Sequence, residues 1–85
     1  MNLYLVVQNE FGGYDTYDSM VVAAKTAQEA RETHPESKRF WWCDPKEIVW
    51  DNTWCSSPDK ATAILIGKAS KGTTAGVICA SFNAG

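Results

Sequence analysis

The stretch from Gly12 to Ala30, GGYDTYDSMVVAAKTAQEA, constrains the fold more than any other, because signals for a turn, a strand and a helix start follow one another in it. Gly12-Gly13 can adopt positive φ without steric cost, so the apolar run from Leu3 to Val7 can reverse there and return as a second strand. Tyr17 to Ala24 is rich in aromatic and β-branched residues, which suit a pleated, partly buried surface. The stretch therefore predicts a β-hairpin that leads directly into a helix.

The helix start is marked by a capping pattern. Thr26 can accept a hydrogen bond at the helix N-terminus, and Glu29, three residues later, can reach back to the Thr26 amide. We expect a short helix over about Ala27 to Thr33, because Pro35 cannot continue it. Small inward-facing side chains would let this helix lie close on the sheet; the expected inward positions are Ala27, Ala30 and His34.

The first strand, Asn2 to Asn9, is apolar on both of its faces. Strand alternation separates Leu3, Leu5 and Val7 from Tyr4 and Val6, and both sets are hydrophobic. This pattern predicts an interior strand with both faces covered.

The rest of the chain holds two more predicted strands and one irregular segment. The strands are Thr62 to Ile66 and Val77 to Phe82, joined by a polar loop, and the irregular segment is an aromatic insertion at about 36–58 in which Glu47 to Cys55 could form a small hairpin. Eighty-five residues allow a single domain, 1–85, with one small core, so a dimer interface or a bound partner would add to its stability. The predicted class is α+β: a small antiparallel sheet in the order ββα, aromatic insertion, ββ, with one short helix on one face.

Charge and cysteine usage exclude several classes of function. Five basic and ten acidic residues precede Lys60, a balance of −5, whereas three lysines and no acids make up residues 60–85, a balance of +3. The sequence has no basic stripe of the kind that binds nucleic acid, and no run approaches the roughly 20 apolar residues of a membrane span. Three cysteines and the absence of a signal-peptide pattern favour a reducing compartment, so we expect a cytoplasmic protein.

Tryptophan is concentrated in the aromatic insertion. Four tryptophans lie within fourteen positions, and each ring buries about 150–250 Å², which is more than a core of this size accommodates easily. Adjacent Trp41 and Trp42 would point to opposite faces of an extended segment, and an exposed tryptophan beside Arg39 has the composition of a binding hot spot. For Trp50 and Trp54, filling the space beneath the insertion is the competing interpretation.

Catalytic and metal chemistry find little support in the sequence. His34 is the only histidine, and its position suits a helix C-terminus rather than a nucleophile pair. Asp15 and Asp18 could act as an acid and base pair, but local hydrogen bonds to backbone amides explain them more simply. We predict a protein that is not an enzyme and uses no cofactor or metal. A zinc site remains an open alternative, although it would lack a C-x-x-C pair; its ligands would be His34, Cys43 and Cys55, with Asp44 or Cys79.

The last strand carries a further expectation. Cys79 alternates within this apolar strand, and we expect it to be a small buried hydrophobic residue.

Two motifs resemble a family of small tailed-phage and prophage proteins. They are GYDTYDSMVVAA at 13–24, followed by the helix that ends in His34-Pro35, and GVICASFNAG at 76–85, so that the likeness covers roughly half of the chain. The resemblance implies an accessory phage gene product acting in the host cytoplasm, and it transfers no catalytic residue. Small phage accessory proteins often bind and disable a host component, which is an analogy at the level of the class.

The leading functional hypothesis is therefore a non-catalytic counter-defence protein that binds and inhibits a host immune or regulatory protein. The expected binding residues are Tyr14, Asp15, Tyr17, Asp18, Arg39, Trp41, Trp42, Trp50, Trp54 and Asn83. The alternative is sequestration of a nucleotide immune signal between aromatic rings, with Asn83, Lys68 or Lys71 on its polar atoms, at the interface of a homodimer. A housekeeping subunit of a phage assembly is a third possibility, and an enzyme ranks last.

Overall fold

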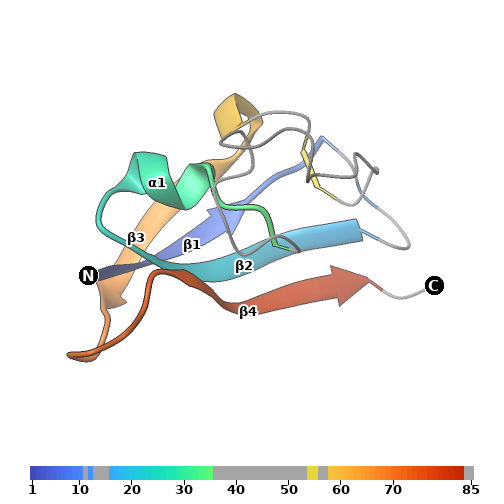
Figure 1. Ribbon diagram of the computed structural model, residues 1–85. Helices are drawn as coiled ribbons and strands as arrows, with labels where there is room; N and C mark the ends of the chain where they lie inside the picture. The colour runs from blue at the N-terminus through green and yellow to red at the C-terminus, as the bar shows by residue number, and fades with distance from the viewer. Residues whose placement is uncertain (11, 13–15, 36–53, 56–57, 84–85) are drawn as a thin grey trace, which may run out of the picture.

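A computed structural model describes residues 1–10, 12, 16–35, 54–55 and 58–83 of the chain. Most of the regular structure is strand, and the described part of the chain contains a single short α-helix (Figure 1). The elements in chain order are β1 (Asn2–Val7), β2 (Thr16–Ala24), α1 (Ala27–Arg31), the 3-10 helix η1 (Pro58–Lys60), β3 (Thr62–Lys68) and β4 (Gly76–Asn83).

The predicted hairpin is present. β1 and β2 pair antiparallel from Asn2 opposite Ala24 to Val7 opposite Ser19, so the chain reverses between them as expected. Buried Gln8 extends the pairing past the end of β1, because its side-chain amide donates to the Tyr17 carbonyl at 2.8 Å. Parts of the turn itself, residues 11 and 13–15, lie outside the described residues.

The four strands form one antiparallel sheet in the order β3-β1-β2-β4. The prediction that the first strand is interior is confirmed, because β1 has a neighbour on each side. The two closing strands do not pair with each other but add to opposite edges of the hairpin (Figure 1). Both are slightly longer than their predicted spans.

The helix begins where the capping pattern predicts. Thr26 has extended backbone, and its Oγ1 accepts a hydrogen bond from the Glu29 amide at 3.1 Å. The return bond differs from the prediction, because the Glu29 carboxylate accepts from the Lys25 amide at 3.2 Å rather than from that of Thr26. The helix also ends earlier than predicted, at Arg31.

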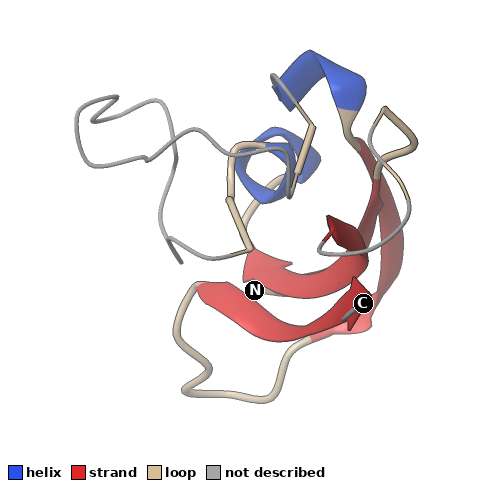
Figure 2. Ribbon diagram, turned by 90° about the vertical axis from the view of Figure 1, so that its right-hand side faces the viewer, coloured by secondary structure: helices blue, strands red, loops and turns tan. Residues whose placement is uncertain are grey.

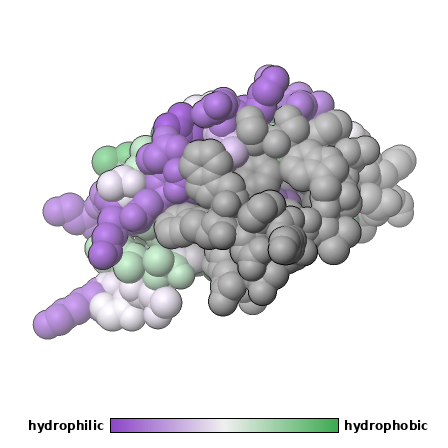
Figure 3. Space-filling view, turned by 45° about the horizontal axis from the view of Figure 1, so that its top comes forward, coloured by the Kyte–Doolittle hydropathy of each residue, from purple (hydrophilic) through white to green (hydrophobic). Residues whose placement is uncertain are grey.

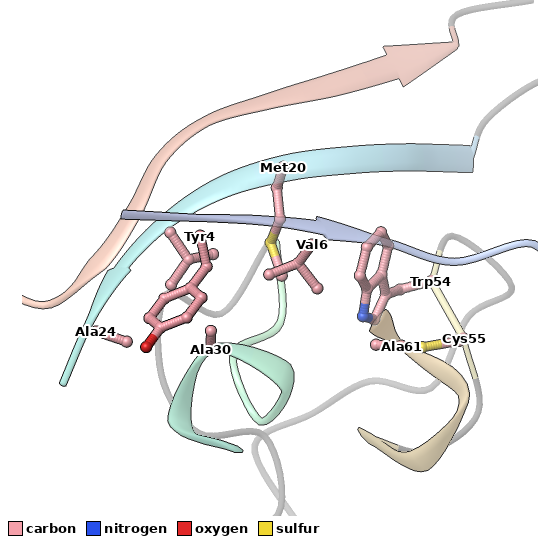
Figure 4. Close-up of a cluster of buried hydrophobic side chains, with 9 residues drawn as sticks. Tyr4, Val6, Met20, Ala24, Ala30, Trp54, Cys55 and Ala61 are labelled. Carbon is pink, nitrogen blue, oxygen red and sulfur yellow. The ribbon is translucent and has the colours of Figure 1, made fainter. Parts of the chain in front are cut away.

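One face of the sheet packs against α1, and the core lies between them (Figure 2). Ala30 is fully buried at the contact, and its single methyl group lets the helix approach the strands closely. His34 is buried just beyond the helix, whereas Ala27 is exposed, so two of the three predicted inward positions are correct. Figure 4 shows the cluster, whose members are Tyr4, Val6, Met20, Val22, Ala24, Ala30, Trp54, Cys55 and Ala61.

The opposite face of the sheet is not covered in the same way. Leu3, Leu5 and Val7 of β1 are only partly buried, and no helix in the described ranges packs on their side. The expectation that both faces of β1 are covered is therefore wrong for the described part of the chain. One short helix can bury one face of a sheet, so the apolar residues of the other face remain partly exposed.

Candidate functional site

Large apolar side chains are exposed on the two edge strands of the sheet. Leu65 is the most exposed, at 61%, and Ile66 and Ile78 are each 53% exposed. Ile64 and Phe82 exceed 40% as well. Isolated exposed hydrophobic residues are normal, but several together on neighbouring positions mark an interaction surface.

The strand register shows which of these exposed side chains lie on which face of the sheet. Two rows of paired residues cross the sheet from β3 to β4, one on each face. Residues directly opposite one another share a face of the sheet. The row on the helix side is Ala63, Val6, Met20 and Ala80, and the row on the other side is Ile64, Leu5, Val21 and Cys79. In the first row Val6 and Met20 are buried while Ala80 is exposed, so burial on the helix side ends between β2 and β4.

On β3 the three consecutive residues Ile64, Leu65 and Ile66 are all exposed. Ile64 lies opposite Leu5 on the uncovered face, and Leu65 lies opposite Tyr4 on the helix side. Ile66 falls at an irregularity in the pairing of β3 with β1. β3 is an edge strand of the sheet that the described residues form, and it presents apolar side chains on both faces.

Exposed lysines flank this apolar segment. Lys60 ends η1, two residues before β3 begins, and Lys68 is the last residue of β3. Asp59 beside Lys60 is exposed too, but residues 60–85 contain no acid. We call Lys60, Ile64, Leu65, Ile66 and Lys68 the β3 surface: an edge strand whose apolar residues project to both faces of the sheet, with a basic residue at each end.

The helix side of the molecule has a different character. Figure 3 shows hydrophilic side chains along the top of the described surface, with separate hydrophobic patches toward the left. The residues from Lys25 to Gln28, at the start of α1, are exposed.

The acidic edge predicted at Tyr14 to Asp18 is described only in part. Tyr17 is half-buried against the core, and its ring contacts that of Phe82 with centroids 4.8 Å apart and planes at 47°. Asp18 is exposed at an irregularity in the pairing of β2 with β4, and its carbonyl accepts from the Gln8 amide at 3.4 Å. Tyr14 and Asp15 lie outside the described residues.

Trp54 is a core residue, which corrects its assignment to the binding set. Its side chain is 0% exposed and lies in the cluster with Cys55 and Ala61 (Figure 4). The indole Nε1 is buried and has no hydrogen-bond partner in the described part of the chain. A buried ring cannot contact a partner, so the interpretation of Trp54 as a packing residue is the correct one.

The structure leaves the rest of the predicted binding set undecided. Asn83 is the last residue of β4 and lies opposite Thr16. The other members fall outside the described residues: Arg39, Trp41, Trp42 and Trp50.

The structure describes only some of the residues of the alternative zinc site. Cys43 and Asp44 lie outside the described residues, and the remaining described part holds no group of three potential ligands. Cys55 is buried, and Cys79 is exposed. The expectation that Cys79 is buried is wrong, because β4 is an edge strand and Cys79 lies opposite Val21 on the uncovered face.

Sequence reasoning missed the exposed aliphatic residues of the closing strands. The signal was present in the chain, since TAILIGK and GVICASFN are apolar at successive positions and the sequence predicts only one short helix. One helix cannot bury both faces of four strands. The reasoning about surplus apolar area that we applied to tryptophan therefore applies equally to these strands.

The fold and surface together define a class: a small antiparallel sheet protein, covered by a helix on one side, with apolar edge strands at the surface. No family model, curated protein or solved structure matches the chain. None of the helices in the described ranges has the length and apolar character needed to cross a membrane.

Proposed function

We propose that this protein is a non-catalytic phage accessory protein that binds a host immune or regulatory protein through the β3 surface. The observation that carries the proposal is the exposure of Ile64, Leu65 and Ile66 in direct succession, at 46%, 61% and 53%. The phage context and the counter-defence role rest on the resemblance of the two terminal motifs.

The composition of the β3 surface suits a protein partner. Protein interfaces combine an apolar centre, from which water is excluded, with a polar rim that stays accessible to solvent. Ile64, Leu65 and Ile66 would supply the apolar centre. The lysines at the two ends of the β3 surface would supply the polar rim. A partner with an apolar contact bordered by carboxylates fits both parts, because complementary charges favour encounter and fix orientation.

Nucleotide sequestration is less well supported by the described residues. It calls for tryptophan and tyrosine faces around a base, and Trp54, one of the four tryptophans, is buried. The partly exposed ring pair of Tyr17 and Phe82 lies at one end of the sheet, whereas Lys68 lies opposite Asn2 at the other end. Within one chain Lys68 therefore cannot contact a base held by this ring pair, whereas Asn83 directly follows Phe82 in β4.

The test compares two apolar residues on opposite edges of the sheet. Tagged wild-type chain and the variants Leu65→Gln and Ile78→Gln are expressed in host cells, isolated natively and analysed by quantitative mass spectrometry. We expect the same host protein with the wild type and Ile78→Gln, and about tenfold less of it with Leu65→Gln, as for loss of a hot spot of about 1.4 kcal/mol.

The control is matched because both positions are exposed aliphatic residues in edge strands. Binding of the purified host protein to each variant by calorimetry then separates direct contact from indirect recovery. Equal recovery with all three chains, or enrichment of no host protein by the wild type, would overturn the proposal.

A further inference from the structure

β3 exposes apolar side chains on both faces of the sheet at neighbouring positions. Leu65 lies opposite Tyr4 on the helix side and is 61% exposed. Ile64 lies opposite Leu5 on the other face and is 46% exposed. A partner laid on one face of the sheet could cover only one of these two side chains. A partner that continues the sheet beyond β3 contacts both, because side chains alternate between the two faces of a strand.

The hydrogen bonds at the two ends of β1 show how the backbone alternates across the sheet. The Gln8 amide donates to the Asp18 carbonyl of the β2 side. The Ala69 amide, just after β3, donates to the Met1 carbonyl at 3.0 Å. Successive residues of an antiparallel strand bond to opposite neighbours, so even-numbered residues of β1 bond to β2 and odd-numbered residues bond to β3.

The outward backbone groups of β3 are those of Ala63 and Leu65. Leu5 is odd-numbered and pairs with Ile64, so the N–H and C=O of Ile64 point to β1 and those of the residues on either side point away. β3 is an edge strand of the sheet that the described residues form, so these groups face its open edge. Ile66 is unpaired and forms a bulge that ends this regular stretch. An added strand can therefore bond to two residues of β3 before the bulge.

We propose that the partner of the β3 surface supplies an extended apolar segment with carboxylates at its ends, which adds to β3 as a further strand of the sheet. This inference rests on the proposed function, because it states how the host protein is bound. Main-chain hydrogen bonds to Ala63 and Leu65 hold the segment, and its side chains pack beside Ile64 on one face and Leu65 on the other.

Charge selects a partner that carries carboxylates. Residues 60–85 contain three lysines and no acidic residue. Lys60 precedes β3, Lys68 ends it and Lys71 follows in the loop. Exposed Asp59 offsets the charge at the first end, so the end at Lys68 is the more strongly positive. β3 is roughly 20 Å long, so the carboxylates of a matching segment lie about six to eight residues apart.

The same charges disfavour a second copy of this chain on the β3 edge. In an antiparallel pair of two β3 strands, Lys60 of one copy comes near Lys68 of the other at both ends of the pair. Like charges opposite one another destabilise a strand pair, and lysine is one of the residues with which natural proteins protect an edge strand. The lysines therefore oppose a like strand and attract an acid-ended one.

The first experiment tests whether the purified chain binds an acid-ended strand. The probe is a fluorescein-labelled peptide of seven alternating valine and threonine residues, the length of β3, between two pairs of glutamates. The control peptide carries lysines in place of the glutamates. Fluorescence anisotropy should show saturable binding of the first peptide and at least about tenfold weaker binding of the second. No binding of the acid-ended peptide at up to about 1 mM chain, or equal binding of the two peptides, would overturn the proposal.

The second experiment tests the backbone contact without changing a side chain. The chain is assembled by native chemical ligation at Cys55, from a thioester of residues 1–54 and a synthetic peptide of residues 55–85. N-methylation of the Leu65 amide in that peptide removes an outward N–H of β3 and blocks the approach of a strand. We expect the acid-ended peptide to bind this chain at least about tenfold more weakly than the unmodified ligated chain.

The matched control is N-methylation of Ala80 on the other edge strand. Its neighbours Cys79 and Ser81 pair with odd-numbered residues of β2, which bond to β4, so the Ala80 N–H also points outward. This chain should bind the acid-ended peptide as the unmodified chain does, and circular dichroism melts check that all three chains fold. Equal affinities of the three chains would overturn strand addition to β3.

The peptide tests and the recovery of a host protein can fail separately. Recovery of a host protein that depends on Leu65, together with no binding of the acid-ended peptide, would support the proposed function and overturn strand addition. Binding of the peptide to the β3 edge without recovery of any host protein would support strand addition and overturn the proposed function.

Discussion

Tyr4 and Leu65 lie directly opposite one another across the β1–β3 pair, yet Tyr4 is 6% exposed and Leu65 is 61% exposed. The two side chains lie on the helix side of the sheet, so the difference in their exposure depends on which of two adjacent strands each residue belongs to. Tyr4 belongs to the interior strand and packs in the core cluster, whereas Leu65 belongs to the edge. The boundary between core and interaction surface therefore runs between β1 and β3.

Truncating Tyr4 and truncating Leu65 should change the free energy of unfolding by very different amounts. Tyr4→Ala removes a buried ring and should lower the free energy of unfolding by about 3–5 kcal/mol, whereas Leu65→Ala should change it by less than about 0.5 kcal/mol. Urea unfolding followed by circular dichroism measures both. A large loss of stability in Leu65→Ala would show that Leu65 packs internally and would remove it from the β3 surface.

Trp54 offers a test of a buried polar group that has no partner among the described residues. Trp54→Ala should cost about 3–5 kcal/mol of unfolding free energy, because the ring is wholly buried in the core. Trp54→Phe should cost much less, since the loss of ring volume is offset by removal of a buried N–H whose unmet hydrogen bond costs about 1–3 kcal/mol.

Chemical denaturation of the two Trp54 variants against the wild type provides the comparison. If Trp54→Phe were as unstable as Trp54→Ala, the indole N–H would have to contribute favourably to the folded state.

Local signals predicted the first part of the fold well. The strand composition of Tyr17 to Ala24 and the oxygen of Thr26 each act over a few residues, so the second strand and the helix start could be predicted from neighbours in the sequence. The predicted role of the glycine pair is not confirmed, because Gly12 does not have positive φ and Gly13 lies outside the described residues. The order of the strands in the sheet could not be predicted from neighbouring residues. That β3 joins β1 while β4 joins β2 depends on packing between distant segments, and nothing in the intervening sequence specifies it.

The same distinction separates the predicted site from the surface that the structure reveals. Exposure is a property of tertiary packing: Trp54 and Leu65 are both large and apolar, yet the first is buried and the second is exposed. The composition indicated more apolar side-chain area than the core can bury, but we assigned this surplus to tryptophan alone. Alternation along β3 and β4 indicates which side chains share a face, but only the position of each strand in the sheet determines whether that face is covered.

The helix cap should be a measurable contribution to stability. Thr26→Ala removes the acceptor for the Glu29 amide and should lower the unfolding free energy by about 1 kcal/mol, whereas Thr26→Ser keeps the oxygen and should cost only a few tenths. The helix has five residues and carries the fully buried Ala30, so loss of the cap weakens the cover of the sheet as well. Thermal melts of the two variants at equal concentration give the comparison, and identical midpoints would mean that the cap contributes little.

The lysine at the start of β3 should govern how fast the host protein binds. Charges at the rim of an interface act mainly on the association rate, which falls as salt screens them. Lys60→Gln should therefore lower the association rate and flatten its dependence on salt, while the dissociation rate changes little. Lys25→Gln is the control for loss of one positive charge, because Lys25 is also exposed but lies outside the β3 surface, at the end of the sheet that holds Lys68 rather than Lys60. The separation along β2 is roughly 17 Å, about twice the screening length of about 8 Å at physiological salt. Surface plasmon resonance with the recovered host protein at several salt concentrations measures both rates, and equal salt slopes for Lys60→Gln and Lys25→Gln would place the partner elsewhere on the molecule.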